Sequence, residues 1–187
     1  MNIPNQLTLL RIILIPVMVL IAYLDIFQQT IFLNISLANF INVIIFAVAS
    51  LTDLLDGMIA RKYNMVTTFG KFADPLADKL LVMTAMVLLM QQGVFPMWAL
   101  IVILSREFIV TGIRLVAVET GKVIAASNLG KLKTATTMIA LIVLFFFQIN
   151  TAVEITAQIL VYVATFFTVI SGFDYFYKNR KIILESI

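Results

Sequence analysis

The sequence predicts an all-α, polytopic membrane protein with six transmembrane helices, forming a single membrane-embedded domain over residues 1–187. Three observations predict this. Hydrophobic residues make up 62% of the 187 residues and charged residues only 12%, whereas a soluble domain carries about a quarter charged residues. The mean hydropathy is +1.07. Apolar runs close to the length of one membrane span, about 20 residues, recur along the whole chain.

The apolar runs fall at 7–27, 35–60, 72–91, 95–118, 134–149 and 152–177. The first run follows a short start without the basic residues that precede the apolar core of a signal peptide, so we expect it to be retained as a helix. The connection between the second and third runs is short. We therefore expect these two helices to be antiparallel neighbours.

Basic residues are found on alternate connections only, which predicts the orientation in the membrane. The connections near 28–34, 91–96 and 149–153 contain no Lys or Arg. Those near 61–71 and 119–133 and the C-terminal tail contain Arg61, Lys62, Lys71, Lys122, Lys131, Lys133, Lys178, Arg180 and Lys181. Because cytoplasmic loops carry the excess of Lys and Arg, both termini are predicted to be cytoplasmic.

The residue counts exclude several chemistries. The chain has no Cys and no His, which excludes disulfides, thiolate zinc sites, a cysteine nucleophile and a histidine base. A metal site here must use oxygen ligands, which suit Mg²⁺, Mn²⁺ or Ca²⁺. The net charge of +3 gives no reason to expect a nucleic-acid partner.

Four aspartates lie where the second and third helices are joined. Asp53 and Asp56 are three residues apart, and Asp74 and Asp78 are four apart, so each pair lies on one side of its helix. Antiparallel helices would bring all four to one cytoplasmic end. Clustered carboxylates stay ionised only if cations bind among them, which favours a divalent metal site. The alternative is a set of salt bridges at the helix ends.

Two glycines and two arginines accompany this cluster. Gly57 and Gly70 allow either close helix packing or the close approach of a planar ligand. Arg61, one turn beyond Gly57, suits a phosphate group, with pairing to an aspartate as the alternative. Arg11, deep in the first helix, is a further phosphate candidate, or its side chain extends to the membrane interface.

A second, basic group is predicted from the fourth and fifth helices. Its members are Arg106, Arg114, Lys131 and Lys133. Charged residues within spans are costly and therefore candidates for function. We interpret the group as a pocket for an anionic substrate group, most simply a phosphate. For Arg106 the alternative is a salt bridge with the adjacent Glu107.

The chain contains the pattern Asp53-x2-Asp56-Gly57-x2-Ala60-Arg61-x8-Gly70-x3-Asp74-x3-Asp78. This pattern resembles the signature of the CDP-alcohol phosphotransferase family at every defined position. Eight fixed residues at fixed spacing make this a highly specific match. The family's fold has six transmembrane helices, in agreement with the apolar runs over essentially the whole chain.

The resemblance implies roles for these residues. Asp53, Asp56, Asp74 and Asp78 would hold divalent metal, Mg²⁺ or Mn²⁺, as two ions, and Asp78 would also be the catalytic base. Gly57, Ala60, Arg61 and Gly70 match positions that line the cytidine diphosphate pocket. The resemblance also implies assembly as a homodimer, with a second copy of the chain as the partner.

Two further stretches, NIPNQLTLLRI and SREFIVTGIR, and the compact length are most similar to the bacterial members that make phosphatidylglycerophosphate. This implies transfer of a phosphatidyl group from CDP-diacylglycerol to sn-glycerol 3-phosphate, with release of CMP, at a site open to membrane lipids in the bacterial cytoplasmic membrane. The same chemistry with another acceptor, such as serine or a phosphorylated polyol, is one alternative. A cation transporter with an acidic site is an alternative of a different class.

Overall fold

The computed structural model describes residues 2–62, 67–119, 121, 124 and 127–185, without the side chains of 3, 32, 54–57, 59–62, 71 and 181–185. Six long helices dominate these residues and confirm the all-α fold class. They are α1 (Ile3–Tyr23), α2 (Leu37–Lys62), α3 (Thr68–Gln91), α4 (Met97–Glu119), α5 (Asn128–Leu144) and α6 (Thr151–Glu185). Short 3₁₀ turns, η1 (Asp25–Phe27) and η2 (Phe147–Ile149), follow α1 and α5.

Five of the helices begin at a polar cap, and this explains where the boundaries differ from the apolar runs. In each case a side chain accepts a hydrogen bond from a backbone N–H three residues further on, and the capping residues are Asn2, Ser36, Thr67, Ser127 and Asn150. Such caps satisfy N–H groups that a helix start leaves free. Helix α5 therefore begins at Asn128, before the apolar run predicted from residue 134, and includes the basic residues ahead of that run.

A small hairpin that the apolar pattern did not predict joins α1 to α2. Its strands β1 (Thr30–Phe32) and β2 (Ile35–Ser36) pair antiparallel. Leu33 and Asn34 form the turn with φ values of +48° and +64°. Two successive left-handed residues are the backbone that a two-residue hairpin turn requires.

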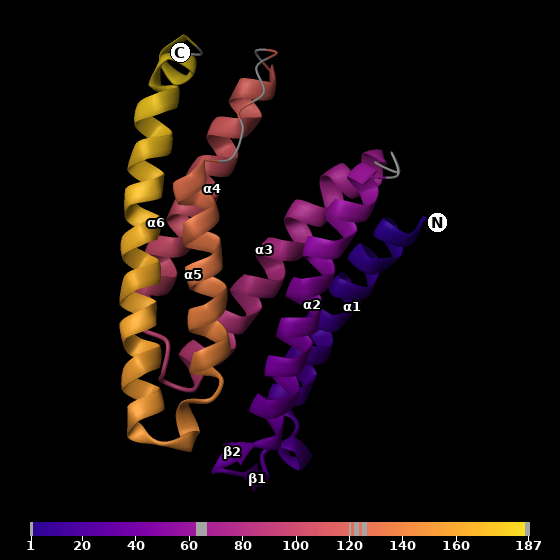
Figure 1. Ribbon diagram of the computed structural model, residues 1–187, viewed down its shortest axis with the longest axis vertical. Helices are drawn as coiled ribbons and strands as arrows, with labels where there is room; N and C mark the ends of the chain where they lie inside the picture. The colour runs from indigo at the N-terminus through magenta and orange to yellow at the C-terminus, as the bar shows by residue number, and fades with distance from the viewer. Residues whose placement is uncertain (1, 63–66, 120, 122–123, 125–126, 186–187) are drawn as a thin grey trace.

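The helices form two groups, as Figure 1 shows. Helices α1, α2 and α3 lie together on one side, and α4, α5 and α6 on the other, with the most extensive contacts within each group. Both termini lie at the end of the molecule where α2 is joined to α3, and the hairpin lies at the opposite end. Because both termini lie at the same end, the chain passes along the long axis an even number of times.

The core is built from large apolar side chains and many small ones. Phe46, Leu81 and Leu141 are fully buried. The fully or almost fully buried alanines are Ala49, Ala77, Ala85, Ala99, Ala117, Ala140, Ala157 and Ala164. Small residues let helix backbones approach closely, which is how helices associate inside a bilayer.

The outer surface is apolar, as expected of a membrane protein. Phe72 is 70% exposed and Phe173 73% exposed. By length and composition, three stretches of the described residues could cross a membrane, namely Pro4–Tyr23, Asn128–Ile149 and Thr151–Arg180, and Leu37–Asp53 is a shorter apolar helix. Charged residues interrupt the apolar sequence of α2, α3 and α4. Membrane insertion is thus supported, while the count of six spans stays a prediction.

Candidate active site

The first helix presents a polar stripe toward the aspartates of α2 and α3. Asn5, Thr8 and Arg11 are spaced three residues apart and therefore lie on one side of α1. Arg11 is fully buried, and its Nη1 lies 2.7 Å from Oδ1 of Asp53. The structure thus pairs Arg11 with an aspartate of the predicted site, and its side chain does not extend to the interface.

The other two members of the stripe contact the start of α3. The hydroxyl of Thr8, which is fully buried, donates a hydrogen bond to Oδ1 of Asp74. Oδ1 of Asn5 accepts one from the hydroxyl of Thr67, the cap of α3, at 2.9 Å. These contacts join α1 to α3 at the position of one predicted metal ligand.

Gly70 lies within this junction, where a side chain would crowd its neighbours. A β-carbon at residue 70 would lie 3.2 Å from Oγ1 of Thr67, 3.3 Å from Oδ1 of Asn5 and 3.4 Å from Oδ2 of Asp74. Gly70 is itself buried. A side chain here would therefore press on the polar groups that join α1 to α3 beside Asp74.

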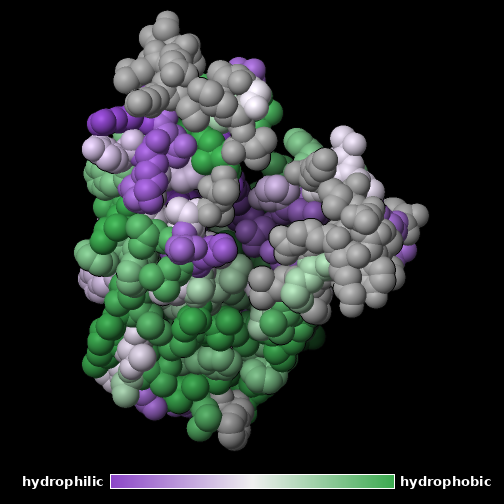
Figure 2. Space-filling model, turned by 45° about the horizontal axis from the view of Figure 1, so that its top comes forward, coloured by the Kyte–Doolittle hydropathy of each residue, from purple (hydrophilic) through white to green (hydrophobic). Residues whose placement is uncertain are grey.

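A cavity opens between the two groups of helices, next to Asp78. Its volume is about 60 Å³. In Figure 2, hydrophilic side chains gather around a hollow near the end where α2 and α3 are joined, above a broad hydrophobic body. The cavity is lined by Asp78, Lys79, Val82, Met83, Met86, Ile103, Leu104, Glu107, Lys133, Thr134, Thr137 and Met138.

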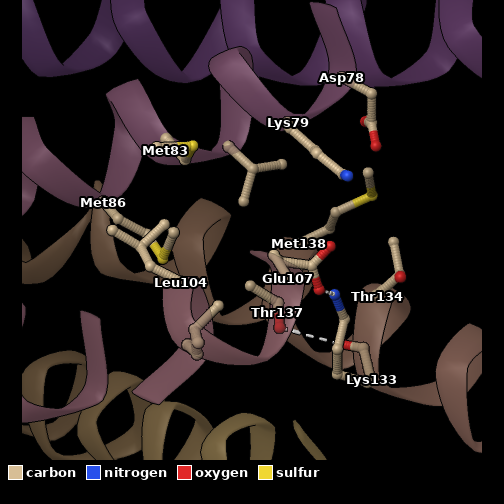
Figure 3. Close-up of a pocket in the computed structure, with 12 residues that line it drawn as sticks. Asp78, Lys79, Met83, Met86, Leu104, Glu107, Lys133, Thr134, Thr137 and Met138 are labelled. Carbon is tan, nitrogen blue, oxygen red and sulfur yellow. Dashed lines mark hydrogen bonds and ion pairs between the residues drawn. The ribbon is translucent and has the colours of Figure 1, made fainter. Parts of the chain in front are cut away.

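The charged groups of the cavity lie on opposite walls. Figure 3 shows Asp78 and Lys79 on α3, with Glu107 on α4 and Lys133 on α5 across from them. The ammonium group of Lys79 donates to the hydroxyl of Thr111 on α4. The polar groups thus come from three helices that meet at the junction of the two halves.

Glu107 forms ion pairs with one basic residue of α4 and one of α5. Its Oε1 lies 2.5 Å from Nζ of Lys133 and 3.1 Å from Nη1 of Arg106. Nη2 of Arg106 continues to the hydroxyl of Ser171 on α6 at 2.9 Å. The bridge between Arg106 and Glu107, considered as an alternative from the sequence, is therefore present.

The four predicted acceptor-binding residues are not equivalent. Lys133 lines the cavity. Arg106 does not line it but forms an ion pair with Glu107, which does. Lys131 is exposed in the first turns of α5 and is not among the lining residues. Arg114 points to α6, where its Nε donates to the hydroxyl of Tyr175 at 3.1 Å and its guanidinium lies over that ring.

The predicted ligands can be compared with the needs of a divalent ion. Among the side chains that the structure describes, no three acidic groups lie close enough together to hold one ion. Asp53 and Asp74 instead contact Arg11 and Thr8. However, Oδ1 of Asp78 is buried with no hydrogen-bond partner among the described residues. A buried carboxylate oxygen of this kind fits a hard cation.

Several predicted residues lie outside the described side chains. These are Asp56, Gly57, Ala60 and Arg61, all within the helical backbone of α2. Conversely, sequence reasoning did not assign a site role to Asn5, Thr8 or Glu107. The signal for the first two was present, because polar residues repeat every three positions in an otherwise apolar helix.

Comparison with known proteins supports the resemblance. The family model for CDP-alcohol phosphatidyltransferase matches residues 1–170. The CDP-diacylglycerol–glycerol-3-phosphate 3-phosphatidyltransferase of Bacillus subtilis is 46% identical over 99% of this chain and 98% of its own length. Proteins of the same name from Rickettsia typhi and Haemophilus influenzae are each 39% identical, over 94% and 100% of this chain and 95% and 97% of their own lengths. The chain belongs to the CDP-alcohol phosphatidyltransferase family.

Proposed function

We propose that this chain is a single-domain membrane enzyme that transfers a phosphatidyl group from CDP-diacylglycerol to sn-glycerol 3-phosphate, giving phosphatidylglycerophosphate and CMP. The names and full-length coverage of its relatives support the reaction. The observation that carries it is the cavity lined on one side by Asp78, whose buried Oδ1 has no hydrogen-bond partner among the described residues, and on the other by Lys133. One side suits an attacking hydroxyl and the other suits the acceptor's phosphate.

Asp78 acts as the general base in this proposal. The carboxylate takes the proton of the acceptor's 1-hydroxyl while that oxygen forms a bond to the phosphatidyl phosphorus. The bond from this phosphorus to the bridging oxygen of the diphosphate breaks, and CMP leaves with the electron pair. Oδ1 of Asp78 is buried without a hydrogen-bond donor among the described residues, which leaves it free to accept the proton.

We also propose divalent metal dependence, with Mg²⁺ or Mn²⁺ as two ions. The carboxylates of Asp53, Asp56, Asp74 and Asp78 would hold the metal, which when bound would neutralise the negative charge of the donor's diphosphate. Arg11 and Thr8 would not be metal ligands themselves, but each contacts one of these carboxylates and would hold it in place.

Substrate binding divides between two groups of residues. Gly57, Ala60, Arg61, Gly70 and Arg11 are proposed for the donor's cytidine diphosphate, with Arg11 contributing through Asp53. The acceptor's phosphate is proposed to bind Lys133 first, while Arg106, Lys131 and Arg114 add positive charge around the cavity. A phosphorylated acceptor needs this excess of basic groups more than zwitterionic serine does.

We further propose that the six helices span the bacterial cytoplasmic membrane, with both termini and the site on the cytoplasmic side. The one-sided distribution of Lys and Arg supports this orientation. A lateral opening to the lipids would admit the donor without removing its acyl chains from the bilayer. Assembly as a homodimer, as implied by the family, remains part of the same proposal.

The reaction can be tested by measuring CMP release from purified protein with CDP-diacylglycerol and Mg²⁺. Glycerol 3-phosphate, serine, inositol phosphate and no acceptor would be compared. Release only with glycerol 3-phosphate is expected. Release with a different acceptor would reject the assignment of the acceptor, and no release from folded protein would reject the proposed reaction.

The role of Asp78 can be tested with Asp78→Asn, which keeps the size of the side chain but removes its basicity. We expect CMP release to be abolished in a protein that remains folded. Asp25→Asn is the matched control, because Asp25 is exposed in η1 at the opposite end of the molecule. Full activity of folded Asp78→Asn would contradict the role of this residue.

A further inference from the structure

Glu107 is a carboxylate in a cavity that is proposed to bind a phosphate. A negative group beside a phosphate site opposes binding, so its presence needs an explanation. Its Oε1 occupies the position between Lys133 and Arg106 where a phosphate oxygen could be held by both. Glu107 therefore satisfies the two cations in the absence of substrate.

The two cations differ in how freely they can leave Glu107. Arg106 is fixed from α6, because its Nη2 donates to the fully buried Ser171. A β-carbon at Gly172 would lie only 3.0 Å from Cγ of Arg106, so the stem of the arginine lies directly against the backbone of α6. Arg106 is thus held beside Glu107 whatever occupies the cavity.

Lys133 has more freedom. Its side chain is buried, but among the described residues its ammonium has Glu107 as its single hydrogen-bonding partner, and it lines the cavity together with Asp78. When the ammonium of Lys133 turns to an anion in the cavity, Glu107 still has Arg106 as its partner. No buried charge is then left unpaired, and this keeps the exchange of partners inexpensive.

We propose that Glu107 is a specificity-determining positioning residue, an internal counter-ion that competes with the acceptor's phosphate for Lys133. This inference rests on the proposed function, because it assigns the cavity to a phosphorylated acceptor. The competition weakens binding of every simple anion, so that inorganic phosphate does not block the site. It also helps the product leave, since the product retains the same phosphate group.

Glu107→Gln tests this idea, because it removes the charge and keeps the shape of the side chain. We expect inorganic phosphate to inhibit the variant at a concentration at least fivefold lower than that needed for the wild type. The KM for glycerol 3-phosphate should fall with it, and kcat should fall because product release slows. A purely structural role predicts the opposite, a looser pocket with weaker binding of both anions.

The control is Glu119→Gln, the same change on the same helix at an exposed position. We expect it to leave phosphate inhibition as in the wild type. If Glu107→Gln does not fold, Glu107→Asp, which withdraws the charge by one methylene, should shift inhibition in the same direction by a smaller factor. Unchanged or weaker inhibition of a folded Glu107 variant would overturn the inference, as would an equal effect of Glu119→Gln.

A binding measurement separates this inference from the proposed reaction. Thermal stabilisation by inorganic phosphate, recorded without donor or metal, needs no turnover. We expect the phosphate concentration for half-maximal stabilisation to be at least fivefold lower in Glu107→Gln than in the wild type. Wild-type protein that never releases CMP would reject the reaction, whereas equal phosphate binding by the two proteins would reject the role of Glu107.

Discussion

The hydroxyl of Thr8 on α1 donates a hydrogen bond to Oδ1 of Asp74 on α3, joining residues 66 positions apart in the sequence. Thr8 is fully buried, and its hydroxyl oxygen also lies 3.1 Å from the carbonyl oxygen of Pro4, the alternative acceptor for the same proton. An aspartate in this position cannot rotate freely. The first helix therefore fixes the orientation of a carboxylate that we propose as a metal ligand.

Replacing Thr8 with Val removes the hydroxyl and keeps the shape of the side chain. A hydrogen bond to a charged group contributes about 1.5–3 kcal/mol, so we expect the Mg²⁺ concentration for half-maximal CMP release to rise about tenfold. Thr8→Ser keeps the hydroxyl and should remain close to the wild type. A metal dependence of Thr8→Val equal to that of the wild type would show that Thr8 does not orient Asp74 for metal binding.

The pair of Arg11 and Asp53 predicts a stability effect that is separate from activity. Arg11 is fully buried, and removing one partner of a buried ion pair costs about 3–5 kcal/mol. We therefore expect Arg11→Met to lower Tm markedly. Combining it with Asp53→Asn should recover most of the lost Tm but no CMP release, because a proposed metal ligand is missing. A double variant no more stable than Arg11→Met would contradict the pairing.

Gly70→Ala should reduce activity much more than stability. The added β-carbon would crowd Asn5, Thr67 and Asp74, all within 3.2–3.4 Å. We expect the rate of CMP release to fall about tenfold or more, since small displacements of a catalytic group are costly. Gly112→Ala on α4 is the control, because nothing lies within 4 Å of its β-carbon position. Equal activities of the two variants would refute the crowding argument.

Replacing Lys133 and replacing Arg114 should have different effects on the KM for the acceptor. Lys133 lines the cavity, whereas Arg114 is directed toward Tyr175. We expect Lys133→Met to raise the KM for glycerol 3-phosphate about tenfold, as for the loss of one charge-assisted hydrogen bond, and Arg114→Met to raise it less. The KM for CDP-diacylglycerol should change little in Lys133→Met. A larger effect of Arg114→Met would place the phosphate outside the cavity.

The sequence was sufficient to predict the helices and the grouping of charged residues near one end. Apolar runs of the length of a span carry that information directly. The sequence was not sufficient to predict which side chains of different helices contact each other. Periodicity shows that Thr8 and Arg11 share a side of α1, but only the packed structure shows that this side meets Asp74 and Asp53. Likewise, adjacency suggested the bridge from Arg106 to Glu107, whereas the contact of Glu107 with Lys133 depends on how α4 and α5 pack.

A final prediction concerns the opposite end of the molecule, where Asn39 and Gln92 join α2 to α3. Their side-chain amides exchange two hydrogen bonds, of 3.0 Å and 2.9 Å, and Asn39 is almost fully buried. Depriving a buried amide of its partner costs about 1–3 kcal/mol, so Gln92→Leu should lower Tm, because it leaves the buried amide of Asn39 without these two hydrogen bonds. Asn39→Leu combined with Gln92→Leu should lower Tm by less than the sum of the two single changes, because neither amide then remains unpaired. The KM values should stay unchanged, since this pair lies far from the cavity. Additive losses of Tm would show that the two amides do not depend on each other.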